Sequence, residues 1–327
     1  MGKGLVKKMI QQERLVQTVL DLVQLDSESK QERAVADYVT ARLTALGYTV
    51  KEDNAGESFG GNAGNVIAYK AGTGAGKCLL FCAHMDTVKP GNGVKPIVEQ
   101  GIIRSDGTTI LGGDDKAGIA AILEAATAME ESGFQHGPVQ IIFTVAEEIG
   151  LLGAKYLDSE QLPAIDAAYF FDSDGMPSEI CVASPYHIDL TVTFRGRAAH
   201  AGVEPEKGIS AIQMAAKAIA AMRLGRLDEE STANIGIIQG GRATNIVTDE
   251  TVIYGEARSL NKSKVDSQIA HMIQCCREAA EQLGGQAEVK VDECYAAIDL
   301  SPDSTTVQLS CAALRKLGME PQLVKSG

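Results

Sequence analysis

The run VQIIFTV, residues 139–145, is almost wholly apolar, and after Ala146 it is followed by two adjacent acids, Glu147 and Glu148. A short apolar run of this kind predicts a strand that is buried on both faces, as in a sheet covered by helices. Further strands are predicted at 48–52, 64–70, 77–83 and 167–172, and helices at 5–24, 30–46 and 115–131. This alternation predicts an α/β sheet with helices on both sides.

The pattern changes near residue 187, where HIDLTVTFRGRA alternates apolar and polar residues as a half-exposed strand does. The order strand, helix, three strands, helix, strand predicts a smaller α+β unit with its helices on one face. We therefore expect an α/β domain over 1–186, an inserted α+β domain over 187–295, and a return to the first domain over 296–327. His187 and Asp189 open the alternating strand and are expected to face solvent.

Charge and cysteine content exclude several classes of protein. The formal net charge of -13 argues against nucleic acid as a partner, because phosphate backbones require basic surfaces. No apolar segment approaches the ~20 residues that span a membrane, and the start of the chain lacks the apolar core of a signal peptide. The seven cysteines contain no CxxC pair, which predicts reduced thiols and a cytoplasmic location.

Ligand-type side chains follow other predicted strands or precede a predicted helix. LLFCAHMD places His84 and Asp86 after a strand, ILGGDDKAG places Asp114 at a helix start, and AAYFFDSDG offers Asp172 or Asp174. In open α/β sheets, active sites form beyond the carboxyl ends of the strands. We therefore expect these side chains and the Glu147–Glu148 pair to meet in one crevice.

Such a group of carboxylates would repel itself, and a divalent metal would remove the repulsion. One histidine with several carboxylates suits zinc, and also manganese or cobalt. Asp86 lies two residues from His84 and is placed to accept the second imidazole N–H. One glutamate of the pair can bind metal while the other acts as a general base. Taken singly, each motif is more typical of a capped turn or a solvated helix start, whereas their combination indicates a site.

The stretches HMDTV, DGTTILGGDDKAG, AEEIGLLGA, FRGRAAHAGVEPEKG and GGRATNIV resemble the dinuclear zinc aminopeptidase/carboxypeptidase superfamily, and its peptidase T-like branch in particular. The resemblance implies a catalytic α/β domain interrupted by a smaller domain that dimerises and acts as a lid. It implies a zinc-dependent peptidase that hydrolyses short peptides, as tripeptidases and aminopeptidases do. Two alternatives are a deacylase or carboxypeptidase acting on N-acyl amino acids, and a metal-binding dimeric protein without hydrolytic activity.

The resemblance also implies a role for each candidate residue. Carried over by position, the metal ligands are His84 and Asp172 for the first zinc, Asp114 as the bridge, and Glu148 for the second zinc. The remaining roles are Asp86 as the group that orients His84, Glu147 as the general base, His200 as a donor to the substrate of a partner subunit, and Arg242 and Asn245 as substrate contacts. In the family, the last histidine ligand follows a stretch that would begin at Gly327 of this sequence. We therefore expect that segment 296–327 is a truncated part of the first domain. We also expect that the second zinc site keeps only Asp114 and Glu148.

Overall fold

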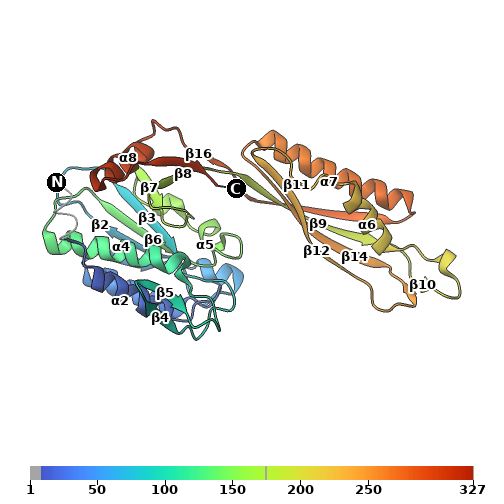
Figure 1. The fold of residues 1–327 in the computed structure, drawn as a ribbon, viewed down its shortest axis with the longest axis horizontal. Helices are drawn as coiled ribbons and strands as arrows, with labels where there is room; N and C mark the ends of the chain where they lie inside the picture. Colours follow the sequence, from blue (N-terminus) through green and yellow to red (C-terminus); the bar gives the residue numbers. More distant parts are fainter. Residues whose placement is uncertain (1–8, 174, 327) are drawn as a thin grey trace. The chain divides into compact units, whose positions relative to one another are not determined.

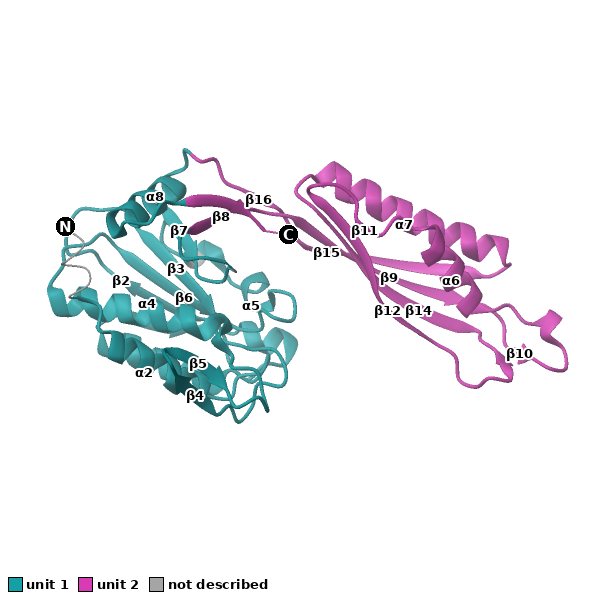
Figure 2. Ribbon diagram, in the orientation of Figure 1, with its two compact units in different colours: residues 1–178, 303–321 teal, residues 179–302, 322–327 magenta. Residues whose placement is uncertain are grey.

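The computed structural model describes residues 9–173 and 175–326. The chain folds into two compact units, drawn in different colours in Figure 2. The first contains residues up to Ser178 together with Asp303–Pro321, and the second contains Glu179–Pro302 and the residues from Gln322 onward. A larger α/β unit interrupted by a smaller α+β unit is the fold class that the sequence predicted.

The boundaries between the units differ from the expected ones at 186/187 and 295/296. The cause is a three-stranded sheet in which β8 (Glu179–Ser184) pairs antiparallel with β16 (Ile298–Asp299) and parallel with β17 (Gln322–Lys325). This pairing assigns β17 to the second unit, so that only α8 (Thr305–Leu317) and the residues next to it return to the first unit.

Five strands form the sheet of the first unit (Figure 1). Their order is β1 (Thr49–Glu52), β2 (Val66–Lys70), β6 (Val139–Thr144), β3 (Leu79–His84) and β7 (Ala167–Phe170). Strand β3 runs parallel to both β6 and β7, whereas β2 is antiparallel to β6 and to β1. The carboxyl ends of β3, β6 and β7 therefore lie at the same edge of the sheet.

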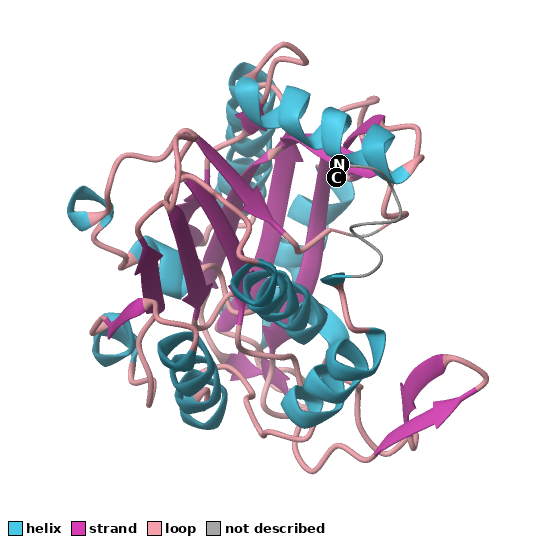
Figure 3. Cartoon of the chain, turned by 90° about the vertical axis from the view of Figure 1, so that its left-hand side faces the viewer, coloured by secondary structure: helices cyan, strands magenta, loops and turns pink. Residues whose placement is uncertain are grey.

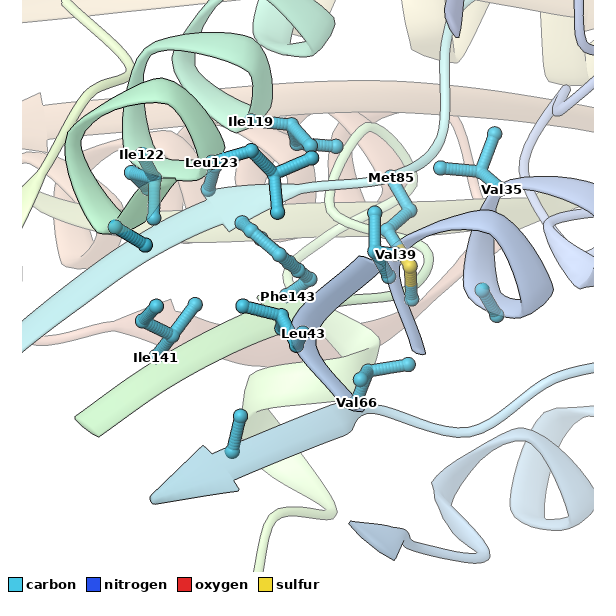
Figure 4. Close-up of a cluster of buried hydrophobic side chains, with 14 of the residues drawn as sticks. Val35, Val39, Leu43, Val66, Met85, Ile119, Ile122, Leu123, Ile141 and Phe143 are labelled. Carbon is cyan, nitrogen blue, oxygen red and sulfur yellow. The ribbon is translucent and has the colours of Figure 1, made fainter. Parts of the chain in front are cut away.

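Helices cover one face of this sheet, and they are α2 (Gln12–Val23), α3 (Arg33–Ala45) and α4 (Gly113–Ser132). Ile141 and Phe143 of β6 point to this face, where Phe143 packs among side chains that include Leu43 of α3 and Leu123 of α4 (Figure 4). The alternate residue Ile142 faces the other way and packs with Leu157, in the segment after α5 (Leu152–Lys155). Burial on both faces explains why the run 139–145 is mostly apolar.

Short elements complete the first unit (Figure 3). They are the 3-10 helices η1 (Ala55–Phe59) and η2 (Ser159–Gln161) and the hairpin β4 (Pro96–Glu99) and β5 (Ile102–Ser105). The hairpin lies within segment 89–107, which is rich in glycine, proline and other turn residues. Part of the helix expected over 5–24 is present as α2, and its first residues lie outside the described residues.

The second unit contains an antiparallel five-stranded sheet with both of its helices on one face. The strand order is β11 (Gly225–Arg226), β12 (Ser231–Gly240), β14 (Glu250–Ser259), β9 (Tyr186–Arg195) and β15 (Gln286–Tyr295). Leu190 and Val192 of β9 are buried in one cluster with Met214 of α6 (Ala211–Ala221) and Met272 of α7 (Lys262–Gln282). The intervening β9 residues point to the opposite face, as the alternating sequence predicts.

Two short strands of the second unit form a ladder that is separate from this sheet. It pairs β10 (Ala199–His200) with β13 (Ile246–Val247), and the 3-10 helix η3 (Pro205–Lys207) follows β10. Among the described residues, every helix is too short or too polar to cross a membrane.

Replacing Phe143 by alanine tests the two-sided burial of β6. The ring is fully buried, so its removal leaves a cavity, and we expect Phe143→Ala to lower the free energy of unfolding of the first unit by about 3–5 kcal/mol in urea denaturation. Ile102→Ala on the hairpin is the control, because Ile102 is 64% exposed and its loss should change stability by about 0.5 kcal/mol at most. Equal effects of the two substitutions would contradict the assigned core.

Candidate functional site

Polar side chains meet where the three parallel strands end. Strand β3 ends at His84, β6 is followed by Glu147 and Glu148, and Asp172 lies two residues beyond β7. The Nε2 atom of His84 lies 3.0 Å from Oδ1 of Asp114, at the start of α4, and 3.9 Å from Oδ1 of Asp172. His84 is buried, whereas the Asp114 side chain is 71% exposed, so the group opens to solvent on the side of the acids.

Two sets of possible ligands share the imidazole of His84. One set is His84, Asp114 and Asp172, and the other is His84, Glu147 and Glu148. Within each set, one donor atom from every residue lies within 4.8 Å of the others. The structure therefore brings together five of the side chains that the sequence pattern singled out. Asp174, the alternative to Asp172, lies outside the described residues.

The buried carboxylate of Asp86 connects His84 to the glutamate pair. Its Oδ1 accepts the backbone N–H of Glu147 at 2.9 Å, and its Oδ2 accepts the backbone N–H of Glu148 at 3.2 Å. Oδ2 also accepts the Ser29 hydroxyl at 2.7 Å. Asp86 therefore fixes the backbone of both glutamates as well as the imidazole beside it.

The orientation of the imidazole follows from the atoms around Nδ1. Nδ1 of His84 lies 2.9 Å from the backbone carbonyl oxygen of Asp86 and 3.4 Å from its Oδ1. Both oxygens only accept, so Nδ1 carries the hydrogen and donates it. In the neutral imidazole that metal binding requires, this tautomer would direct the lone pair of Nε2 to the side of Asp114 and Asp172.

Glu32 supports the turn between β6 and the glutamate pair, a role that the sequence did not indicate. Ser29 and Glu32 form a capping-box pattern at the start of α3, but neither caps it through its side chain. The Oε1 atom of the buried Glu32 instead accepts the backbone N–H groups of Ala146, at 3.0 Å, and of Lys30, at 2.8 Å. Ala146 has a φ of 52°, so Glu32 holds a left-handed turn directly before Glu147.

The residue after Asp114 is also part of the site. Asp115 is buried, and its Oδ2 accepts the backbone N–H of His84 at 3.3 Å. The peptide bond between Asp114 and Asp115 is cis. An acid at this position would ordinarily favour a helix start through the helix dipole. The structure shows that it instead joins the beginning of α4 to the end of β3.

The pKa values reflect a crowded, partly buried set of charges. Burial raises the pKa of Glu147 to about 7, and the carboxylates of Asp172, Glu148 and Asp86 add to the rise against the opposing effect of His84. Burial likewise raises the pKa of Asp115 to about 8. Burial lowers the pKa of His84, but the hydrogen bond and charge of Asp86 and the charges of Asp172 and Glu147 outweigh it, and the pKa rises to about 10.

The donor atoms fit a divalent cation. One imidazole nitrogen and four carboxylates converge, and oxygen and nitrogen donors of this kind are the ligands of zinc, manganese and cobalt. A divalent cation would offset the repulsion between these carboxylates. Asp114, Asp172, Glu147 and Glu148 all retain some exposure, so an ion can reach them.

The three residues expected to contact substrate lie in the second unit. His200 is exposed on β10, and its Nδ1 accepts the backbone N–H of Gly202 at 3.2 Å. In register, His200 lies opposite Ile246, and the next residue, Ala201, donates its backbone N–H to the Asn245 carbonyl at 2.9 Å. Arg242 is exposed and lines a small pocket with Thr248.

Two protein families match parts of the chain. The family described as "Peptidase dimerisation domain" matches residues 182–283, which lie in the second unit. The family described as "Peptidase family M28" matches residues 65–201 and includes the edge of the sheet where the acids meet.

Individual relatives match almost the whole chain. The solved structure of the aminopeptidase PepT from Bacillus cereus ATCC 10987 is 46% identical with a TM-score of 0.88, over 98% of this chain and 86% of that chain. That of a tripeptidase from Staphylococcus aureus subsp. aureus Mu50 is 41% identical with a TM-score of 0.93, over 98% of this chain and 85% of that chain. A Bacillus subtilis (strain 168) protein named YqjE is 46% identical over 98% of this chain and 86% of its own length.

Replacing Asp86 by asparagine tests its part in the site. The Asp86 carboxylate accepts hydrogen bonds from three donors, which are the backbone N–H groups of Glu147 and Glu148 and the hydroxyl of Ser29. An asparagine amide has one oxygen and one NH₂ group, so at least one of these donors would face the NH₂ group. We expect Asp86→Asn to reduce metal affinity about 10- to 100-fold, measured by competition with a chelating dye. Asp37→Asn, at an exposed position on α3, is the control and should leave the affinity unchanged. Unchanged affinity in Asp86→Asn would show that Asp86 does not position the ligands.

Proposed function

This chain belongs to the peptidase T-like branch of the dinuclear zinc aminopeptidase/carboxypeptidase superfamily, and from that premise we propose how its residues hydrolyse short peptides. Hydrolysis of short peptides by a metallopeptidase is the function that the fold and the relatives support. The observation that carries the residue assignment is the meeting of His84 with Asp114, Asp172, Glu147 and Glu148 at one edge of the sheet.

The residues that would hold metal divide between two positions. His84 and Asp172 would hold a first zinc ion, Glu148 would hold a second, and Asp114 would contribute to both. The short distances from His84 Nε2 to the two aspartates support this division. Zinc is proposed because imidazole and carboxylate ligands suit it, and manganese or cobalt would fit the same donors.

The bound cations would supply Lewis acidity and positive charge to the site. Glu147 would take a proton from the attacking water and pass it to the leaving amine. Its backbone N–H is held by Asp86, and its side chain is half-buried, so the carboxylate has a restricted position from which to act. Burial raises the pKa of Asp86, but the hydrogen bonds from His84, Ser29 and Glu147 outweigh this effect, and the pKa is lowered overall. Asp86 would therefore remain ionised throughout.

The second unit would complete the site in a homodimer. The match to a peptidase dimerisation domain supports assembly through this unit. His200 would donate to the developing oxyanion of a substrate bound by the partner subunit, and Arg242 and Asn245 would contact the same substrate. All three are exposed on the second unit, which suits contact with a bound molecule.

We also propose a substrate class and a cellular location for this protein. Tripeptides with a free amino terminus are the preferred substrates, as the names of the two solved relatives suggest. N-acyl amino acids and dipeptides are the competing substrates, and turnover of the three classes in the presence of zinc distinguishes them. A cytoplasmic location is consistent with seven cysteines that form no disulfide.

Replacing Glu147 by glutamine separates proton transfer from metal binding. The amide cannot accept the proton, so we expect kcat on tripeptides to fall by about 100- to 10,000-fold while zinc content stays the same. Glu148→Gln should instead lower the zinc content, and Glu99→Gln on the exposed hairpin should change neither quantity. Full turnover by Glu147→Gln would refute its role as general base.

Mixed dimers test the role of His200. Dimers of Glu147→Gln alone and of His200→Ala alone should both have low activity. A mixed dimer contains one site with an intact Glu147 that receives an intact His200 from the partner, so mixing the two variants after dissociation should restore activity. Failure to restore activity in dimers that have demonstrably exchanged subunits would show that His200 does not act across the interface.

A further inference from the structure

A second group of metal-ligating side chains lies on the β-sheet of the second unit. His187 and Asp189 are two residues apart on β9 and share a face, while Ile188 and Leu190 point to the helices on the other face. In register, Glu256 of β14 lies opposite Asp189. On the other side, β15 has an irregularity between Glu293 and Tyr295 that includes Cys294.

The imidazole of His187 is mostly buried, whereas a side chain that faces solvent would be exposed. Its side chain is 15% exposed, and the expectation that it faces solvent is wrong for this residue. The ring packs against Tyr295, with 5.2 Å between the ring centroids and an angle of 73° between the planes. Tyr295 therefore fixes the direction of the imidazole.

The Nε2 atom of His187 is buried and forms no hydrogen bond among the described residues, although two carboxylates are close to it. Oδ1 of Asp189 and Oε2 of Glu256 each lie 3.0 Å away, in directions that do not satisfy hydrogen-bond geometry. One donor atom from each of His187, Asp189 and Cys294 lies within 4.8 Å of the others. A buried nitrogen without a hydrogen-bond partner, surrounded by anionic donors, is the arrangement found around a metal ion.

The charges also suit a divalent ion. Arg258 Nη2 lies 3.0 Å from Oε2 of Glu256 and neutralises that carboxylate. On β15, Lys290 pairs with Asp292 at 2.6 Å. The charges that remain are those of the Asp189 carboxylate and, with metal bound, the Cys294 thiolate, so one divalent cation gives a neutral cluster.

We propose that His187, Asp189 and Cys294 bind one zinc ion, at a site that is separate in sequence and in residue composition from the group around His84. Imidazole, carboxylate and thiolate are zinc ligands, and three protein ligands leave a position for water. The ion links β9 to β15, which is the edge strand of the sheet and pairs only with β9 among the described strands. The proposal does not depend on the peptidase activity.

Cobalt(II) substitution of the full chain tests the proposal. Thiolate ligation produces a sulfur-to-cobalt charge-transfer band in the near ultraviolet, and none of the residues assigned to the peptidase centre offers a thiolate. We expect the band to appear in the wild type and in His84→Ala, and to be absent in Cys294→Ser. Cys181→Ser, on β8, is the matched control and should retain the band.

Zinc content and activity provide the second measurement. Cys294→Ser should bind one zinc ion fewer per chain than the wild type and should hydrolyse tripeptides at the same rate. If Cys294→Ser does not fold, Asp189→Asn replaces it and should shift the cobalt titration to higher concentrations. Absence of the band in the wild type, its persistence in Cys294→Ser, or an unshifted titration in Asp189→Asn would each overturn the proposal.

Discussion

The hydrogen bonds to the buried carboxylate of Asp86 are the interaction on which the candidate site depends. A carboxylate that is removed from water must be fully hydrogen-bonded, or its burial is costly. Here the partners are the backbone N–H groups of Glu147 and Glu148, the hydroxyl of Ser29, and the adjacent imidazole of His84. Because these groups come from three separate parts of the chain, satisfying one buried charge also fixes the positions of the catalytic candidates.

The same reasoning explains why so many acids are tolerated at one edge of the sheet. Burial and mutual repulsion raise the pKa values of Glu147 and Asp115, which means that the arrangement opposes ionisation of these groups. A stable fold would avoid such a cluster unless something positive compensates for it. The surrounding apolar core, with Phe143 and Val145 fully buried, supplies the rigidity that holds the acids together.

A comparison of the two His-x-Asp pairs shows how context changes one motif. At 84 and 86 the motif begins at the last residue of a strand that is buried on both faces, and the aspartate is buried and supports the backbone. At 187 and 189 the motif lies within a strand that is buried on one face, and both side chains point to the same side of the sheet. The first aspartate orients a ligand, whereas the second is itself a candidate ligand.

The sequence by itself determined the main strands and helices and the positions of the acids at the ends of strands. The spacing of apolar residues and the length of an apolar run reflect which faces of an element are buried. Parallel strands bring their carboxyl ends to one edge of the sheet. The sequence did not predict that Glu32 would support Ala146, that β17 would pair with β8, or that Cys294 would approach His187. Those contacts join residues far apart in the chain, and no local pattern encodes them. Only the tertiary structure decided them, because strand order and register select which distant residues become neighbours.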